Sequence, residues 1–451
     1  MDKPTRDKTE EVGAVSASEA RDVVGQRDGG QGMGHGMGMG GGISFRDLRA
    51  FRSLKSPVFR LYYAAMAGQF AAMNMEMLAR SLLIYRITGS ATALGVMALA
   101  NSIPMLLFSL YGGVIADRVQ KKYVLLWGMA ASGVLTLGIA LSLIFGFLSK
   151  DIPNSWWILV VAALLKGTVQ GLMMPSRQAI IAEIVGEKDL MNAVALGSLE
   201  MNVNRLVMPA LAGFFVEGFG FEAAYFFIAG MYLVAVVFFA LMPLTGTISL
   251  RGRGALADVK DGFRYIRNEP TILMVLVFAL VIVLLSMPYM SLLPVFTEDI
   301  LQVGAGGLGV LMSVSGIGAI AGSLVLASLP NKRRGLMLIV GSLVLGLGLT
   351  GFSFSSAWSL SLAMIVVIGL GQTVRMTLSN TLLQYYTDDE HRGRVMSVYM
   401  MEFGLTSFMA FFAAVMTDYI GVQWAVGGLA ILLVILCVLA LAFMPRMRKL
   451  D

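Results

Sequence analysis

From Pro57 to Arg446 the chain repeats long apolar runs that short polar stretches interrupt. Each run is roughly 20 residues long, the length at which a helix crosses a hydrocarbon core of about 30 Å. Spanning β-strands would alternate apolar and polar side chains over ~10 residues, and stretches such as 123–148 and 424–444 lack that alternation. Because only helices and closed barrels satisfy their backbone groups in lipid, the pattern predicts an all-α membrane protein.

We predict twelve membrane-spanning helices from these runs. The composition agrees, because 57% of the 451 residues are hydrophobic and only 14% are charged, beyond the apolar fraction of an ordinary soluble domain. The one cysteine, Cys437, lies in the last run and excludes an intrachain disulfide. The spans are expected at 59–84, 92–116, 123–147, 155–182, 191–216, 222–243, 271–295, 305–328, 336–355, 358–385, 395–417 and 423–444.

The basic residues between the spans predict the orientation. Lysine and arginine accumulate on cytoplasmic loops, so the N-terminus and, with an even number of spans, the C-terminus are expected inside. The outer loops then hold only Arg86 and Lys150. The inner loops hold Arg118, Lys121, Lys122, Arg177, Lys188, Arg251, Arg253, Lys260, Arg264, Arg267, Lys332, Arg333, Arg334, Arg392 and Arg394. The net charge of +6 therefore fits the topology, and we expect no nucleic-acid partner.

The longest break between spans divides the chain into two halves. Leu94-Gly95-Val96 in span two matches Leu308-Gly309-Val310 in span eight. This is a weak internal repeat of the kind from which secondary transporters are built. Segment 44–57 suits a basic interfacial helix on the anionic inner leaflet or a plain positive flank. The expected parts are a disordered Gly/Met-rich cytoplasmic tail at 1–43, the interfacial helix at 44–57, six-helix bundles at 58–243 and 271–445, a cytoplasmic linker at 244–270 and a short tail at 446–451.

Several motifs carry a resemblance to a known family. The chain reads Gly113-Val114-Ile115-Ala116-Asp117-Arg118-Val119-Gln120-Lys121-Lys122, which resembles the G-x-x-x-D-R-x-G-R-K loop of the major facilitator superfamily, with Gln120 in place of glycine. Further matches are Pro175-Ser176-Arg177-Gln178-Ala179 and Arg392-Gly393-Arg394-Val395-Met396-Ser397. Together they look like the transmembrane secretion branch that includes enterobactin exporters and macrolide-efflux proteins.

The resemblance implies a fold and a function. It implies the twelve-helix facilitator fold, in a monomer that lies in the bacterial cytoplasmic membrane and exports a siderophore or drug-like compound, driven by protons. It also implies a gate, in which Asp117 bonds to the N-terminus of span eleven near Gly393 and Arg394. A carboxylate suits such a terminus. Of the antiporter motif of span five, only Pro209 and Gly213 are kept.

Seven charged residues fall inside the predicted spans. A charge at membrane depth costs about 2.5 kcal/mol or more, so it marks a functional-site hypothesis. They lie on spans 1, 4, 5, 10 and 11, and the resemblance implies that spans 1, 4, 7 and 10 line a central cavity while 3, 6, 9 and 12 face lipid. The seven residues are Glu76, Arg80, Lys166, Glu200, Arg205, Arg375 and Glu402.

Polar residues at helical spacing form three stripes on spans one, four and ten. Their cationic bias predicts a pathway for anionic or zwitterionic substrates, and the alternative is that they only hold helices together. The members of the stripes are Gln69, Met73, Glu76 and Arg80; Lys166, Gln170, Met173 and Arg177; and Gln372, Arg375 and Ser379. The substrate-pathway candidates are Gln69, Glu76, Arg80, Lys166, Gln170, Arg205, Gln372, Arg375 and Ser379.

Proton coupling needs a carboxylate that gains and loses a proton within one cycle. Glu76 has Arg80 four residues on, a spacing that predicts an ion pair. Glu200 and Glu402 have no basic residue three or four positions away. We therefore prefer Glu200 as the proton site, then Glu402, and then Glu76.

No motif indicates an enzyme, because Walker, nucleophile-elbow and HExxH sequences are missing from the chain. Met33, His35, Met37 and Met39 could bind Cu(I) as soft ligands, but a glycine-rich linker explains them as well, and we expect neither a metal nor a cofactor. Two alternatives to export stay open. One is uptake or lysolipid flipping, and the other is a receptor or scaffold that does not transport.

Overall fold

Every regular element of the described residues is a helix, so the predicted all-α class is confirmed. The structure is a computed structural model that describes residues 49–244, 264–330 and 332–451, without the side chains of residues 49–51, Leu110, Val114, Asp117, Glu187, Lys188 and Phe403. The predicted tail at 1–43, with the four soft ligands at Met33 to Met39, and most of the predicted linker at 244–270 lie outside the described residues.

The helices follow the apolar runs closely. The first group is η1 (Arg49–Lys55), α1 (Pro57–Thr88), α2 (Ala91–Arg118), α3 (Lys121–Ile144) and α4 (Trp157–Leu241). The second group is α6 (Pro270–Ser286), α7 (Pro288–Val295), η2 (Phe296–Ile300), α8 (Gly304–Ser328), α9 (Arg334–Ser353), α10 (Trp358–Tyr386), α11 (Arg392–Met400), α12 (Glu402–Ile420), α13 (Val422–Phe443) and α14 (Pro445–Arg448).

Local sequence explains where α1 starts and stops. The Ser56 hydroxyl accepts a hydrogen bond from the Phe59 N–H, and Pro57 occupies the first turn, where its missing N–H costs nothing. Gly89 ends the helix in the left-handed region at φ 62°, a conformation that glycine adopts without steric penalty.

Two glycines divide the long helix α4 into three parts. Gly186 and Gly220 have φ of 68° and 84° with ψ of 173°, which no helix accommodates. We call residues 157–186, 187–220 and 221–241 the first, middle and last parts of α4. They correspond to predicted spans four, five and six.

Ten helical segments of the described chain are long and apolar enough to cross a membrane. The predicted number of twelve is not met by this measure, and two places account for the difference. The segment Asp189–Leu241 counts once although it has 53 residues, far more than the ~20 that one crossing needs. Helix α1 is not among these ten segments. It carries the polar residues Gln69, Asn74 and Glu76 within its length.

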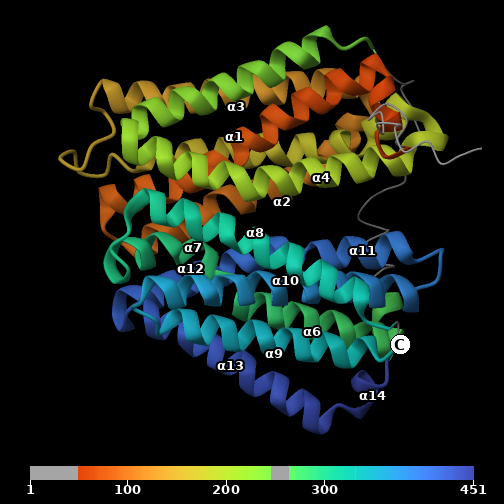
Figure 1. Ribbon diagram of the computed structural model, residues 1–451. Coiled ribbons are helices and arrows are strands. Elements are labelled where there is room, and N and C mark those ends of the chain that lie inside the picture. The colour runs from red at the N-terminus through yellow and green to blue at the C-terminus, as the bar shows by residue number, and fades with distance from the viewer. Residues whose placement is uncertain (1–48, 245–263, 331) are drawn as a thin grey trace, which may run out of the picture. The chain divides into compact units, whose positions relative to one another are not determined.

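Most contacts stay within the two groups of helices (Figure 1). Helices α1, α2 and α3 pack on α4, while α8 and α9 pack on α10, and α13 packs on α9. The most extensive contacts between the groups are those of α2 with α12 and of α4 with α8. All these helices belong to one compact unit, Leu48–Asp451. The predicted bundle and linker bounds stay predictions.

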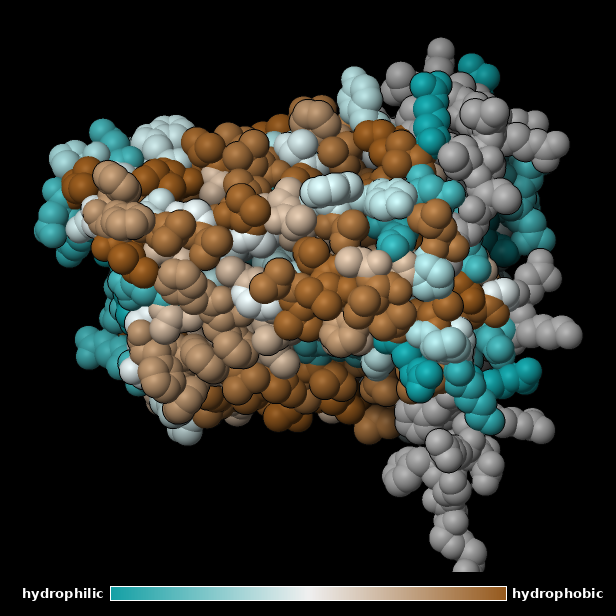
Figure 2. All heavy atoms as spheres, turned by 90° about the horizontal axis from the view of Figure 1, so that it is seen from above, coloured by the Kyte–Doolittle hydropathy of each residue, from teal (hydrophilic) through white to brown (hydrophobic). Residues whose placement is uncertain are grey.

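The surface carries an apolar belt. Figure 2 shows hydrophobic residues across the middle of the face in view, with hydrophilic residues toward both ends. Large apolar side chains point outward all along the helices, among them Trp127, Val134, Leu233, Leu324 and Phe412. Such a belt suits lipid rather than water.

Candidate functional site

Glu76 and Lys166 form an ion pair inside the first group of helices. The two residues are only 4% and 5% exposed. The Lys166 ammonium also donates to the Thr136 hydroxyl of α3 at 2.6 Å, and the Tyr232 hydroxyl donates to Glu76 Oε2 at 3.3 Å. Four helical segments, α1, α3 and the first and last parts of α4, therefore meet at one network of charged and polar groups.

The sequence predicted a different partner for Glu76. A spacing of four residues on one helix pointed to Arg80, whereas the ion pair of the structure joins Glu76 to Lys166. The reason is packing, since α1 lies along α4 and a buried carboxylate finds its cation on the neighbouring helix. Arg80 itself is half-buried.

Arg375 and Glu402 form a second buried pair, in the other group of helices. Arg375 of α10 is 1% exposed and Glu402, at the start of α12, is 5% exposed. The shortest distance, from Arg375 Nη1 to Glu402 Oε2, is 3.7 Å, which is too long for a hydrogen bond. Both of these atoms, and Arg375 Nε, lack a hydrogen-bond partner among the described residues. The pair is therefore close enough to attract but not bonded.

Glu200, the preferred proton site, is buried without a cation. It lies in the middle part of α4 with 5% exposure, and its Oε1 has no hydrogen-bond partner among the described residues. None of the ion pairs formed within this part of the chain includes it. Its chemistry thus differs from that of Glu76, although both are buried carboxylates.

The other pathway candidates occupy different environments, and their roles stay predictions. The Gln372 amide donates to the Met287 sulfur at 3.7 Å, which joins α10 to the junction of α6 and α7. Arg205 is exposed, Gln170 is half-buried, and Gln69 and Ser379 are buried. The residues of the three predicted stripes therefore differ in solvent exposure.

The motif that follows α2 makes ordered contacts at its lysines. Lys121 pairs with Glu183 at 2.5 Å. Lys122 is buried and donates to the Ala240 carbonyl at 3.0 Å and to the Met242 carbonyl, so that a cation satisfies the free carbonyls at the end of α4. Among the other motif residues, Gly113 is half-buried and Arg118 is exposed.

The predicted gate cannot be traced across to its partner, because the Asp117 side chain lies outside the described residues. At the start of α11, Gly393 is exposed and Arg394 half-buried. The preceding loop is held by Tyr265, whose ring stacks on His391 at 4.0 Å and whose hydroxyl donates to Asp388 at 3.1 Å. Burial, and then this neighbouring carboxylate, raise the pKa of Tyr265.

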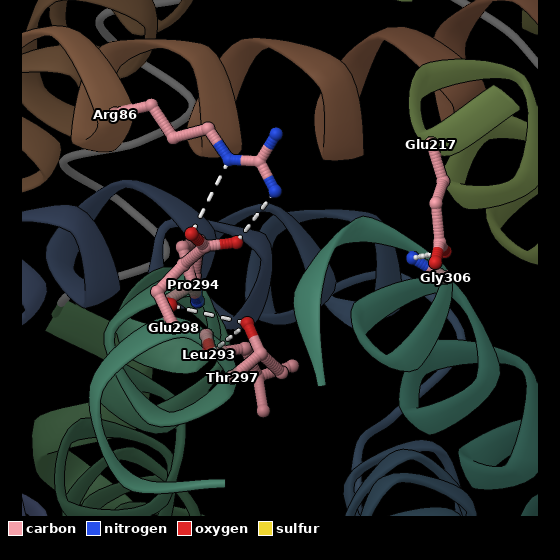
Figure 3. Close-up of polar contacts among 7 residues, drawn as sticks. All are labelled: Arg86, Glu217, Leu293, Pro294, Thr297, Glu298 and Gly306. Carbon is pink, nitrogen blue, oxygen red and sulfur yellow. Dashed lines mark hydrogen bonds and ion pairs between the residues drawn. The ribbon is translucent and has the colours of Figure 1, made fainter. Parts of the chain in front are cut away.

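Other contacts join the two groups of helices where α1 ends. Arg86 pairs with Glu298 at 2.8 Å (Figure 3), and the Tyr85 hydroxyl donates to Asp299 at 2.5 Å. Both carboxylates lie on the single π-turn η2. Sequence reasoning counted Arg86 as a loop residue and missed its acidic partner, Glu298, which follows Pro294 on a distant stretch of chain.

Local chemistry explains this π-turn. Pro294 cannot donate a backbone hydrogen bond, and the Thr297 hydroxyl donates to the carbonyls of Leu293 and Pro294, each at 3.1 Å (Figure 3). A π-turn widens the helix by one residue. Glu298 thereby reaches α1.

Known structures share this fold. The nucleoside transporter NupG superposes with a TM-score of 0.67 at 12% identity, covering 86% of this chain and 99% of that one. A bacterial homolog of the human lysosomal transporter Spinster, in an inward-facing and unoccupied conformation, gives 0.65 at 13% identity, covering 89% and 97%. Identities this low support the fold alone.

Relatives of known activity cover most of the chain. The staphyloferrin A transporter of Staphylococcus aureus is 25% identical over 335 residues, 74% of this chain and 83% of its own. The multidrug efflux pump Tap of Mycolicibacterium fortuitum is 22% identical over 407 residues, 88% and 98%. The enterobactin exporter EntS of Shigella flexneri is 24% identical over 346 residues, 75% and 80%.

A family model matches the chain over residues 61–410 and 289–451. The two matches together span nearly all the described helices. The chain is thus a multi-pass membrane transporter of small molecules, not an enzyme, and it belongs to the Major Facilitator Superfamily.

Proposed function

We propose that the chain exports a siderophore or a drug-like compound across the bacterial cytoplasmic membrane by alternating access, in exchange for protons. The observation that carries the direction of transport is similarity over most of the chain. The relatives named as an enterobactin exporter and a multidrug efflux pump cover 75% and 88% of it.

Glu200 is our candidate for the proton site. An antiporter needs a carboxylate that releases its proton on one side of the membrane and takes one up on the other. Glu76 already has a bonded cation partner, Lys166. Glu200 has no such cation among the described residues and is buried. Glu402 follows it, because its pair with Arg375 is long.

The arginines favour anionic or zwitterionic cargo. Arg205 is exposed in the middle part of α4 and Arg80 is half-buried on α1, so both guanidinium groups can reach a ligand that enters between the helices. Arginine binds carboxylates through two parallel hydrogen bonds. We propose that these residues, with Arg375 and Lys166, give the pathway its cationic character.

The remaining organisation is also proposed from the sequence. We place both termini in the cytoplasm, take the chain as a monomer of two six-helix halves, and give segment 44–57 an interfacial position. The support for the last is that η1 is basic and is held by an ion pair of 3.0 Å from Arg52 to Asp189. Asp117 remains our candidate for the cytoplasmic gate.

The test uses inside-out vesicles that contain the full chain. Enterobactin, staphyloferrin A and a cationic dye are offered outside, with and without an acid lumen. We expect acid-driven accumulation of at least one probe, and Glu200→Gln should reduce it at least tenfold while binding of that probe persists. Glu222→Gln, which neutralises an exposed carboxylate, is the matched control and should transport normally.

Two results would count against the proposal. Accumulation that ignores the pH gradient would remove proton antiport. Accumulation of a probe only when the gradient is reversed would indicate uptake in place of export.

A further inference from the structure

A carboxylate of α12 caps the first turn of α2. Asp418 accepts hydrogen bonds from the Ala91 N–H at 3.0 Å, the Thr92 N–H at 3.1 Å and the Ser90 hydroxyl at 2.9 Å. The residue at the N-cap position of α2, Ser90, makes no such bond with its own side chain. The free N–H groups of a helix start need an acceptor, and here a residue more than 300 positions away supplies it.

A second carboxylate does the same for α8. Glu217, near the end of the middle part of α4, accepts a hydrogen bond from the Gly306 N–H at 2.9 Å (Figure 3). The N-cap residue of α8, Val303, has no side-chain acceptor to offer. Each cap therefore joins one group of helices to the other.

Close glycine contacts lie one turn beyond each capped start. A Cβ on Gly95 of α2 would come within 2.8 Å of Phe411 Cα and 2.9 Å of Ala414 Cβ in α12. A Cβ on Gly309 of α8 would come within 2.5 Å of the Pro209 carbonyl oxygen in α4. Only glycine permits helices to approach this closely. These glycines are the two that the internal repeat aligns, Leu94-Gly95-Val96 with Leu308-Gly309-Val310.

We propose that Asp418 and Glu217 are a pair of symmetry-related latches that hold this face of the transporter closed. Each latch is a carboxylate on the last turns of one helix that caps the first turn of its crossing partner. The predicted orientation puts the face outside, opposite to the predicted gate at Asp117. Both residues are positioning residues, because they act on the equilibrium between conformations and contact no cargo.

The chemistry suits a contact that must break in each cycle. A cap lost on opening is replaced by water at a helix start that stays at the membrane surface, so neither the N–H groups nor the carboxylate is left unsatisfied. Two equivalent latches on the two crossing helix pairs would also release together. The proposal rests on the alternating access of the proposed function.

The test measures the conformational equilibrium directly. Spin labels are placed on Lys150→Cys and Ser356→Cys, two exposed residues in loops of the same predicted outer face, with buried Cys437 replaced by alanine. Distances between the labels are recorded for the full chain in lipid nanodiscs. We expect Asp418→Asn and Glu217→Gln each to raise the ratio of open to closed outer face about tenfold, the effect of losing a charge-assisted hydrogen bond.

Controls separate a latch from a structural role. Glu222→Gln removes an exposed carboxylate in the same region and should leave the distances unchanged, and all variants should elute as folded protein. Asp418→Ala provides a second variant, since an asparagine retains one acceptor oxygen. A double variant, Asp418→Asn with Glu217→Gln, that is folded yet keeps the parent distances would overturn the proposal.

The readout needs neither cargo nor a pH gradient. An unchanged distance distribution would therefore reject the latches while leaving export and proton coupling untouched. A shifted distribution in a chain that transports no probe would reject the proposed function alone.

Discussion

The two buried ion pairs, one in each group of helices, are held very differently. Glu76 and Lys166 are in direct contact; Lys166 also donates to the Thr136 hydroxyl and Glu76 Oε2 accepts from Tyr232, while Glu76 Oε1 has no hydrogen-bond partner in the described chain. Arg375 and Glu402 are as deeply buried, yet their nearest atoms are 3.7 Å apart and three of their polar atoms have no hydrogen-bond partner in the described chain.

The difference lies in how well the polar atoms of each pair are bonded. A buried pair balances its desolvation cost only when its geometry is good and its remaining donors and acceptors are satisfied. The network of Glu76 and Lys166 comes closer to that condition, because Glu76 Oε1 is its one buried side-chain atom without a hydrogen-bond partner among the described residues, and it ties four helical segments together. The pair of Arg375 and Glu402 is further from it, with three such atoms.

The largest effect in this comparison is expected from removing one charge of the bonded pair, Glu76 and Lys166. Lys166→Met should destabilise the protein by about 3–5 kcal/mol, because it strands the Glu76 carboxylate in the interior. The measurement is the midpoint of thermal unfolding in detergent, followed by size-exclusion chromatography. We expect little folded protein to survive at 37 °C.

The control removes both charges. Adding Glu76→Gln to Lys166→Met eliminates the stranded carboxylate and should recover most of the lost stability. If the single variant is as stable as the parent, the network does not hold the helices together.

Replacing the glutamate of each pair by glutamine compares the strengths of the two pairs directly. Glu76→Gln should cost roughly 1–2 kcal/mol more than Glu402→Gln, because it weakens bonds to Lys166 and Tyr232 whereas Glu402 makes no direct bond to Arg375. Chemical unfolding of the two variants in identical micelles measures the difference. Equal losses would show that the 3.7 Å pair is as strong as the bonded one.

Sequence patterns located these charges but not their partners. Lys166 and Arg375 stand out because a cation inside an apolar run is rare. Spacing within a helix then favoured Arg80 for Glu76, since it carries no information about neighbouring helices. The bond from Lys166 to Thr136 could not be foreseen either, because the backbone bond that Thr136 donates to the Ser132 carbonyl at 2.8 Å is enough to explain a threonine in an apolar helix.

The contacts at the ends of the helices were harder still to predict from the sequence. Asp418 and Glu217 lie near predicted span ends, where a carboxylate needs no explanation, and their partners are far along the chain. The aligned glycines, Gly95 and Gly309, were the visible sign of the crossing helices. The internal repeat identified these two glycine positions in the sequence, and only the structure showed which residues pack against them.

The finest test concerns a single hydroxyl that is bonded to the Glu76–Lys166 pair. Thr136→Val keeps the shape of the side chain and removes the oxygen that accepts from Lys166 at 2.6 Å and donates to the Ser132 carbonyl of its own helix at 2.8 Å, so it should cost about 1 kcal/mol. Ser132→Ala is the matched control one turn earlier on α3, because that hydroxyl donates only to the Gly128 carbonyl of its own helix at 2.8 Å. It should cost no more than about 0.5 kcal/mol.

The contrast between these two hydroxyls decides whether the network extends beyond its charges. If Thr136→Val and Ser132→Ala have equal unfolding midpoints, the ammonium of Lys166 needs only Glu76, and the bonded pair differs from the loose one by contact distance alone. If the loss at Thr136 is larger and disappears in the background of Lys166→Met with Glu76→Gln, the two effects are coupled. The hydrogen bonds of the network, and not proximity of charge alone, are then what distinguish this pair from that of Arg375 and Glu402.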